Sequence, residues 1–314
     1  MARLSRRRFN ALAASALAAP GTIGTIGTIG ASALVADVAL AQAPAPLLMR
    51  AIPSSGERIP AVGLGTAAVF SNDDDATRRA AAEVVRALVD AGGRLIDTAS
   101  TYGDAEAVLG KVIGAAHLRE AVFIATKLES PDEAELARSL ARLATPKVDL
   151  LQLHNVRDTG QSLAHFKAWK AAGKCRYIGI TSTYRSDYDA LEAVLRREKP
   201  DFVQVDYSLD NRLAEERILP LAADVKAGVL TALPFGRGRL FRAVRGQALP
   251  DWAKPFAETW AQFFLKFLLG DARITAVIPG TSNGAHMADN LGAMRGRLPN
   301  AEERKRMVAL LGNR

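Results

Sequence analysis

Arg94-Leu95-Ile96-Asp97-Thr98-Ala99, followed by the loop Ser100-Thr101-Tyr102-Gly103 and the segment 105–115, is the stretch that decides the fold. The first part is a short apolar run without polar alternation, as expected of a strand that is buried on both faces. The segment 105–115 has the hydrophobic period of a helix. The stretch therefore predicts one strand–loop–helix unit.

The same unit recurs along the chain. The apolar runs are residues 61–65, 94–99, 122–127, 148–154, 176–181, 202–207, 229–233 and 276–280. Helical segments between them include 77–91, 105–115, 132–144, 162–172 and 187–197.

Buried strands that alternate with helices predict a parallel sheet, and eight such units predict an α/β fold of the (β/α)8 TIM-barrel type. A doubly wound open sheet is the alternative, but no strand-turn-helix carries G-x-G-x-x-G. Residues 48–52 and 58–60 flank Ser54-Ser55-Gly56 and predict a short β-hairpin ahead of the barrel.

Composition agrees with one large domain, expected over residues 47–314. The 314 residues are 49% hydrophobic and 24% charged, and no polar linker divides them. Of the net charge of +8, residues 1–41 carry +3, which leaves +5 for the rest. Such a small excess is typical of solvated surface, so no nucleic-acid partner is expected.

The single cysteine, Cys175, opens an apolar run and is interpreted as a packed strand residue rather than a nucleophile.

Residues 1–41 are interpreted as an export signal. Ser5-Arg6-Arg7-Arg8-Phe9 precedes a stretch rich in small residues that ends at Ala39-Leu40-Ala41. The paired arginines resemble the twin-arginine type of signal, which predicts contact with that export machinery and a periplasmic location. A stable membrane span is not expected, because the middle of the segment is rich in Gly, Thr and Ala. A basic N-terminus before a core helix, or an uncleaved anchor, remains the alternative.

Four polar residues lie at the ends of three consecutive strands of the predicted barrel or in the loop just after: Asp97, Tyr102, Lys127 and His154. Barrel enzymes place their reactive groups at the carboxyl ends of the strands, so these side chains should share one mouth. No metal-ligand cluster or Ser-His-Asp order competes with them, so no metal is expected.

These residue types suit carbonyl reduction. Hydride that arrives on a carbonyl carbon leaves negative charge on the oxygen, which needs a proton or hydrogen-bond donors. Tyr102 would supply the proton, and the Lys127 ammonium would favour its phenolate form. Asp97 would keep Lys127 charged. His154 would donate to the carbonyl oxygen and set its angle.

The motif Asp97-Thr98-Ala99-x-x-Tyr102-Gly103-x-x-Glu106-x-x-x-Gly110 resembles the signature of the aldo/keto reductase superfamily. Ala125-Thr126-Lys127 and residues 150–155 are similar to that family's third and fourth strands, and the likeness covers residues 58–291. It implies a (β/α)8 barrel, NAD(P)H-dependent reduction of aldehydes or ketones, and a small carbonyl compound as substrate. We expect a monomer.

The resemblance also implies a set of cofactor-binding positions. Thr181 and Ser182 stand where the family has a Ser-Asn pair, and Ala232 stands where many members have a ring-stacking Tyr. Phe70 is expected as a wall of the substrate pocket, together with Tyr102 and His154. The implied cofactor contacts are Thr66, Asp97, Thr181, Ser182, Gln204, Pro234, Phe235, Gly236, Gly238, Gly280, Thr281, Asn283, His286, Asp289 and Asn290.

Two of these positions bear on the coenzyme. Members that prefer NADPH often have Lys and Arg where this chain has Gly280 and His286, and a lost guanidinium removes bidentate phosphate binding. The resemblance still favours NADPH, with NADH as the alternative. A cofactor-binding sensor or partner subunit with weak turnover is the alternative to an enzyme.

Overall fold

The computed structural model describes residues 46–312 of the chain. The export signal predicted in residues 1–41 lies outside this part. Within residues 46–312, no helix combines the length and the apolar character that a membrane span needs.

One eight-stranded parallel sheet forms the centre of the molecule, with neighbouring strands adjacent in sequence order. Its strands are β3 (Leu64–Gly65), β4 (Leu95–Asp97), β5 (Phe123–Leu128), β6 (Val148–Leu153), β7 (Cys175–Ser182), β8 (Phe202–Asp206), β9 (Gly228–Ala232) and β10 (Ile274–Val277).

The first and last strands meet and close the sheet into a barrel. Parallel bridges join Val62 to Val277 and Gly65 to Gly280. The amide of Gly65 donates to the Pro279 carbonyl at 2.9 Å. The predicted (β/α)8 fold is therefore confirmed.

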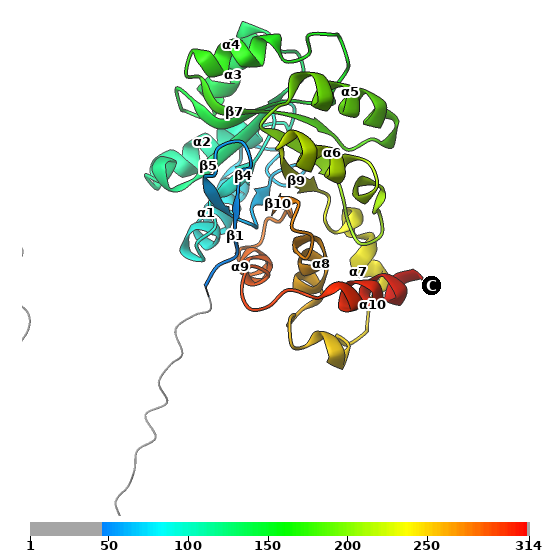
Figure 1. The fold of residues 1–314 in the computed structure, drawn as a ribbon. Coiled ribbons are helices and arrows are strands. Elements are labelled where there is room, and N and C mark those ends of the chain that lie inside the picture. The colour runs from blue at the N-terminus through cyan, green and yellow to red at the C-terminus, as the bar shows by residue number, and fades with distance from the viewer. Residues whose placement is uncertain (1–45, 313–314) are drawn as a thin grey trace, which may run out of the picture. The chain divides into compact units, whose positions relative to one another are not determined.

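Helices follow the strands and surround the barrel (Figure 1). They are α1 (Asp75–Asp90), α2 (Ala105–Ala115), α3 (Glu133–Arg142), α4 (Ala164–Ala171), α5 (Tyr188–Glu198), α6 (Ile218–Val225), α7 (Arg239–Ala243), α8 (Trp260–Leu269), α9 (Gly284–Gly292) and α10 (Ala301–Gly312). The α2 bounds agree with the sequence-based prediction.

The last strand departs from the prediction of residues 276–280. Strand β10 begins at Ile274 and ends at Val277. Pro279 has no amide hydrogen and so cannot donate to a ladder, which limits regular pairing on this side. Gly280 still forms an isolated bridge to Gly65.

The predicted hairpin is present as β1 (Met49–Ala51) and β2 (Arg58–Pro60), which pair antiparallel. Its Ile52 and Ile59 are buried with Leu95, Phe123 and Phe202. Because these three residues come from the beginnings of barrel strands, the hairpin closes the amino-terminal end of the barrel.

The interior changes from apolar to polar toward the carboxyl ends of the strands. Side chains two residues apart on a strand point to the same face. Asp97 therefore lies one layer above Leu95, Gln152 above Leu150 and Gln204 above Phe202. This polar layer forms the floor of the site.

Candidate active site

The structure brings the four predicted catalytic residues together at the carboxyl end of the barrel. Lys127 Nζ lies 2.6 Å from Asp97 Oδ2 and donates to the Thr98 carbonyl at 2.7 Å. Lys127 Nζ is 4.9 Å from the centre of the Tyr102 ring. The Tyr102 and His154 rings meet edge to face, with centroids 5.7 Å apart.

Asp97 and Lys127 form a buried ion pair, with side chains that are 4% and 2% exposed. Burial alone lowers the pKa of Lys127, but the Asp97 carboxylate and the Tyr102 oxygen outweigh it, so the pKa lies above its ordinary value. Lys127 is therefore a cation beside Tyr102 at neutral pH.

Two glutamines complete the floor. Gln152 Nε2 donates to Asp97 Oδ1 at 3.3 Å, and Gln204 Nε2 donates to Asp97 Oδ2 at 3.2 Å. Each amide oxygen, Oε1, is buried and has no hydrogen-bond partner among the described residues. The buried hydroxyl of Thr66 also has no hydrogen-bond partner among the described residues. A buried acceptor without a partner costs free energy, so the floor is suited to a ligand that carries an amide donor.

His154 has a neighbour that the sequence analysis did not identify. Its Nδ1 lies 3.0 Å from Glu129 Oε2 and 3.4 Å from Thr101 Oγ1. Burial and the nearby Lys127 charge lower the pKa of His154 to about 4. Glu129 follows Lys127 by two residues, so the period of the strand that carries Lys127 could have indicated it.

Thr181 and Ser182, the last two residues of β7, differ in whether their hydroxyls are already hydrogen-bonded. Thr181 is buried in the strand beside Gln204. Ser182 Oγ donates to Asp187 at 2.7 Å and accepts from the Tyr184 amide at 3.0 Å. The Ser182 hydroxyl is thus engaged in the turn before α5, whereas Thr181 and Gln204 lie side by side on neighbouring strands.

The loop after β9 carries four of the implied cofactor contacts, Pro234, Phe235, Gly236 and Gly238. Gly236, Arg237 and Gly238 all have left-handed backbone angles, with φ of 54°, 54° and 79°. The Gly236 amide donates to the Leu233 carbonyl at 2.8 Å, and the Gly238 amide donates to the Phe235 carbonyl at 3.0 Å. The Gly236 and Gly238 amides therefore form hydrogen bonds within the loop.

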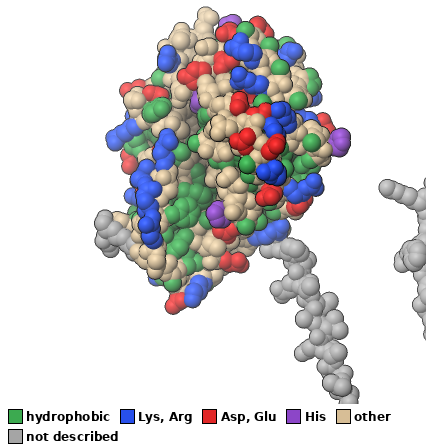
Figure 2. Space-filling model, turned by 180° about the vertical axis from the view of Figure 1, so that it is seen from behind, with side chains coloured by type: hydrophobic (Ala, Val, Ile, Leu, Met, Phe, Trp, Pro, Cys, Tyr) green, Lys and Arg blue, Asp and Glu red, His purple; other side chains and the backbone are tan. Residues whose placement is uncertain are grey.

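Arginines supply the positive charge of the same loop. Arg237, Arg239 and Arg242 are exposed. Arg239 pairs with Asp210 at 2.8 Å, but Arg237 and Arg242 have no ion-pair partner among residues 46–312. Figure 2 shows a column of basic side chains beside a hollow lined by hydrophobic ones. An anionic ligand with a planar apolar part suits such a surface.

The residues after β10 surround the start of α9. Asn283 Oδ1 accepts from the Ala285 and His286 amides at 2.8 and 3.1 Å, and Thr281 Oγ1 accepts from the Asn283 amide at 3.1 Å. His286 is exposed. Asp289 accepts from Gln262 of α8 at 2.8 Å. Asn283 is thus the helix cap, and Asp289 joins two helices.

The structure also shows how tightly three more predicted site residues, Asn290, Phe70 and Gly280, are packed. Asn290 is 3% exposed, and Phe70 is fully buried in the main hydrophobic core. A ring without exposed surface packs the core and does not form an open pocket wall, which corrects the expectation for Phe70. A Cβ on Gly280 would lie 3.2 Å from the Gly65 carbonyl oxygen, so this position is tight.

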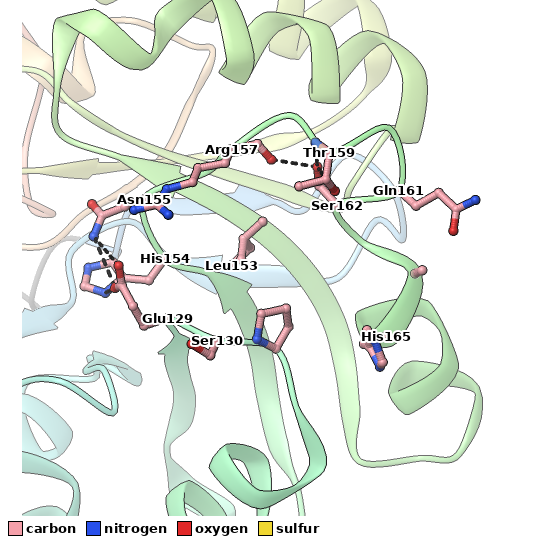
Figure 3. A pocket seen from close by; sticks show the side chains of 12 residues that line it. Glu129, Ser130, Leu153, His154, Asn155, Arg157, Thr159, Gln161, Ser162 and His165 are labelled. Carbon is pink, nitrogen blue, oxygen red and sulfur yellow. Dashed lines mark hydrogen bonds and ion pairs between the residues drawn. The ribbon is translucent and has the colours of Figure 1, made fainter.

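A pocket of about 400 Å³ lies beside His154 (Figure 3). It lies between the loops that follow β5 and β6, and most of the residues that line it have polar side chains. The polar lining includes Glu129, Ser130, His154, Asn155, Arg157 and Gln161.

Comparison with known proteins agrees with this architecture. A sequence model of the Aldo/keto reductase family matches residues 61–310. The chain belongs to this family. An aldo-keto reductase of Mycolicibacterium smegmatis is 30% identical over 251 residues, which cover 74% of this chain and 81% of that protein. The methylglyoxal reductase YeaE of Escherichia coli is 28% identical, over 78% of this chain and 88% of the relative.

Solved structures of the family superpose well. An aldo-keto reductase from Klebsiella pneumoniae in complex with NADPH has a TM-score of 0.73 at 26% identity, covering 85% of this chain and 96% of that one. The thermostable aldo-keto reductase Tm1743 has a TM-score of 0.70 at 26% identity, covering 84% and 100%. Among residues 46–312, no group of three or more His, Cys, Asp or Glu side chains is placed to hold a metal ion.

Proposed function

We propose that this aldo/keto reductase uses NADPH to reduce an aldehyde or ketone to an alcohol, with Tyr102 as the proton donor. The observation that carries the proposal is the Asp97–Lys127 pair beside the Tyr102 ring. Family membership and the reductase relatives support the reaction type.

The residues present fit a nicotinamide cofactor. Gln204 Oε1 is a buried acceptor that could bind the carboxamide, with Thr181 beside it. The exposed Arg237 and Arg242 would attract the phosphates, and Thr281, Asn283 and His286 lie where the adenosine end is expected. Such a cofactor supplies the hydride of the reaction. NADPH-bound structures of related reductases favour NADPH over NADH.

The chain's own groups handle the proton. As the substrate oxygen gains negative charge, the Tyr102 hydroxyl donates its proton to that oxygen. The phenolate that remains is stabilised by Lys127 Nζ, 4.9 Å from the ring centre. Asp97 holds Lys127 in place and balances its charge at 2.6 Å. Removal of the Tyr102 hydroxyl should therefore abolish protonation without disturbing the ion pair.

A combined binding and turnover experiment tests the proposal. Titration with NADPH and with NADH, followed by nicotinamide fluorescence, measures the two affinities, and nitrobenzaldehyde reduction measures turnover. We expect NADPH binding, turnover, and a loss of at least about 100-fold in kcat for Tyr102→Phe. Full activity of Tyr102→Phe would exclude Tyr102 as the donor. Tight binding with only a slow single turnover would favour the cofactor-binding sensor instead.

We also propose export by the twin-arginine route, supported by Arg6, Arg7 and the Ala39-Leu40-Ala41 site in the sequence. A fusion of residues 1–41 to a folded reporter should reach the periplasm. Arg6→Lys combined with Arg7→Lys should keep the reporter in the cytoplasm. Unchanged export of that double variant would contradict the proposal.

A further inference from the structure

Ser100 lies two residues before Tyr102, and its amide, hydroxyl and carbonyl are all hydrogen-bonded. The amide donates to the Lys127 carbonyl at 3.0 Å. The hydroxyl donates to Glu135 at 2.6 Å, and the carbonyl accepts from Arg142 at 3.1 Å. Glu135 and Arg142 both belong to α3, so this helix holds the side chain and the backbone of Ser100 at once.

Helix α3 is a firm support for these two contacts. Glu135 and Arg142 are seven residues apart, which is about two helical turns, so they lie on the same face of the helix. At the start of α3, the Asp132 carboxylate caps the helix and accepts from the Glu135 amide at 2.7 Å. At its end, α3 packs so closely on α2 that a Cβ on Gly110 would overlap the Arg142 carbonyl. Both ends of α3 are therefore fixed.

Glu135 also holds a second loop. It accepts from the Glu129 amide at 3.1 Å and from the Ser130 amide at 2.7 Å, in the loop that follows β5 (Figure 3). The residue is 8% exposed. An ionised carboxylate has about four acceptor sites, so Glu135 can accept from the Ser100 hydroxyl and from both amides together. One buried carboxylate thus joins the loop that carries Tyr102 to the loop after β5.

We propose that Glu135 is a positioning residue of the reaction, which acts through Ser100 to keep Tyr102 in place beside Lys127. Proton transfer needs its donor and acceptor atoms about 3 Å apart, and a displacement of about 1 Å can lower a rate about 100-fold. The Tyr102 ring centre lies 4.9 Å from Lys127 Nζ, and Ser100 is the anchored residue of the same loop. The effect on catalysis rests on the proposed function, whereas the link between Glu135 and the loop does not.

Hydrogen–deuterium exchange tests this link without cofactor or turnover. The amides of Ser100, Tyr102 and Asp104 all donate to backbone carbonyls, so their exchange reports opening of the loop. We expect Ser100→Ala to speed exchange in a peptide covering residues 99–105 by about tenfold or more. That variant removes a hydrogen bond to a charged group, and the loss of such a bond changes an opening equilibrium by at least this order.

Ser139→Ala is the matched control for the exchange experiment. Ser139 also lies on α3, and its buried hydroxyl donates to the Glu106 carboxylate. The control therefore loses the same kind of hydrogen bond at a site that does not hold the Tyr102 loop. Its exchange in residues 99–105 should match that of the wild type. Equal exchange in Ser100→Ala and the wild type, or an equal increase in Ser139→Ala, would overturn the proposal.

A second measurement tests the effect on catalysis. NADPH titration counts the molecules that bind cofactor, and nitrobenzaldehyde reduction then gives kcat for each such molecule. We expect this kcat to fall about tenfold in Ser100→Ala and about 100-fold in Glu135→Gln, with an unchanged Kd for NADPH. The larger loss in Glu135→Gln is expected because a glutamine amide nitrogen cannot accept, so both loops lose support.

The same data separate positioning from general damage to the fold. If the number of NADPH-binding molecules falls in proportion to the activity, kcat for each molecule is unchanged, and a role in positioning is refuted. Ser139→Ala should keep the wild-type kcat for each binding molecule, and an equal fall there would also refute the role. Absence of turnover in the wild type would instead count against the proposed function, and the exchange result would still decide whether Glu135 holds the loop.

Discussion

The buried pair of Asp97 and Lys127 should dominate the stability of the barrel mouth. Their charged atoms are 2.6 Å apart, and neither side chain is more than 4% exposed. Removing one partner of such a pair costs about 3–5 kcal/mol, because the other charge stays buried without compensation. We expect Asp97→Asn to cost about 3 kcal/mol, since Lys127 keeps its hydrogen bond to the Thr98 carbonyl.

Replacing Lys127 instead of Asp97 should lower the free energy of unfolding by somewhat less. In Lys127→Met the Asp97 carboxylate retains the Gln152 and Gln204 amides at 3.3 and 3.2 Å, so we expect about 2 kcal/mol. The double variant leaves no unpaired charge. Its cost should therefore fall short of the two single costs added together by about 2 kcal/mol.

Urea unfolding at pH 7.5, followed by circular dichroism and tryptophan fluorescence, measures these free energies when the two signals coincide. Lys111→Met is the matched control, because Lys111 pairs with Asp73 at the surface and is 56% exposed. It should change the free energy of unfolding by less than about 1 kcal/mol. If the double variant loses as much free energy of unfolding as the two single variants together, the two charges are not coupled and the explanation is wrong.

Two further predictions concern His154 and the loop that carries Tyr102. Because the pKa of folded His154 is about 4 and its ordinary value is 6.5, the unfolded chain binds more protons between these values. The free energy of unfolding should therefore fall by up to about 3 kcal/mol as the pH drops from 6.5 to 4, and urea unfolding of His154→Gln should show a shallower pH dependence than the wild type; equal slopes would contradict this. Gly103 has a φ of 59°, and a Cβ there would lie 2.5 Å from the Ser71 carbonyl oxygen. Gly103→Ala should lower both stability, by about 2 kcal/mol, and kcat, whereas Gly160→Ala, with a φ of 80° and open space, should cost only about 1 kcal/mol and leave kcat unchanged. Similar effects of the two variants would show that the contact with Ser71 does not position Tyr102.

Local sequence patterns predicted the elements and much of the site because strand and helix periods are local properties. Apolar runs located the strands, and the polar residues at or just after the ends of three of them drew attention to Asp97, Tyr102, Lys127 and His154. The period of two along a strand also explains why Lys127 and Gln204 share the interior.

Other features depended on contacts between distant segments. Phe70 lies in the main hydrophobic core, and the Ser182 hydroxyl bonds Asp187 and the Tyr184 amide in the turn before α5. The glycine-rich loop after β9 uses its amides internally, which depends on three consecutive left-handed residues. Backbone angles of this kind depend on the loop's surroundings and have no periodic signature.

The sequence by itself determined the strand–helix repeat and placed the four candidate catalytic residues at the strand ends, because side-chain periodicity follows from backbone geometry alone. Tertiary structure alone decided the closure of β3 against β10 and the contact of Glu129 with His154. Both depend on how strands and loops far apart in the chain are aligned in space. That alignment is set by the packing of the whole barrel, which no local stretch of sequence contains.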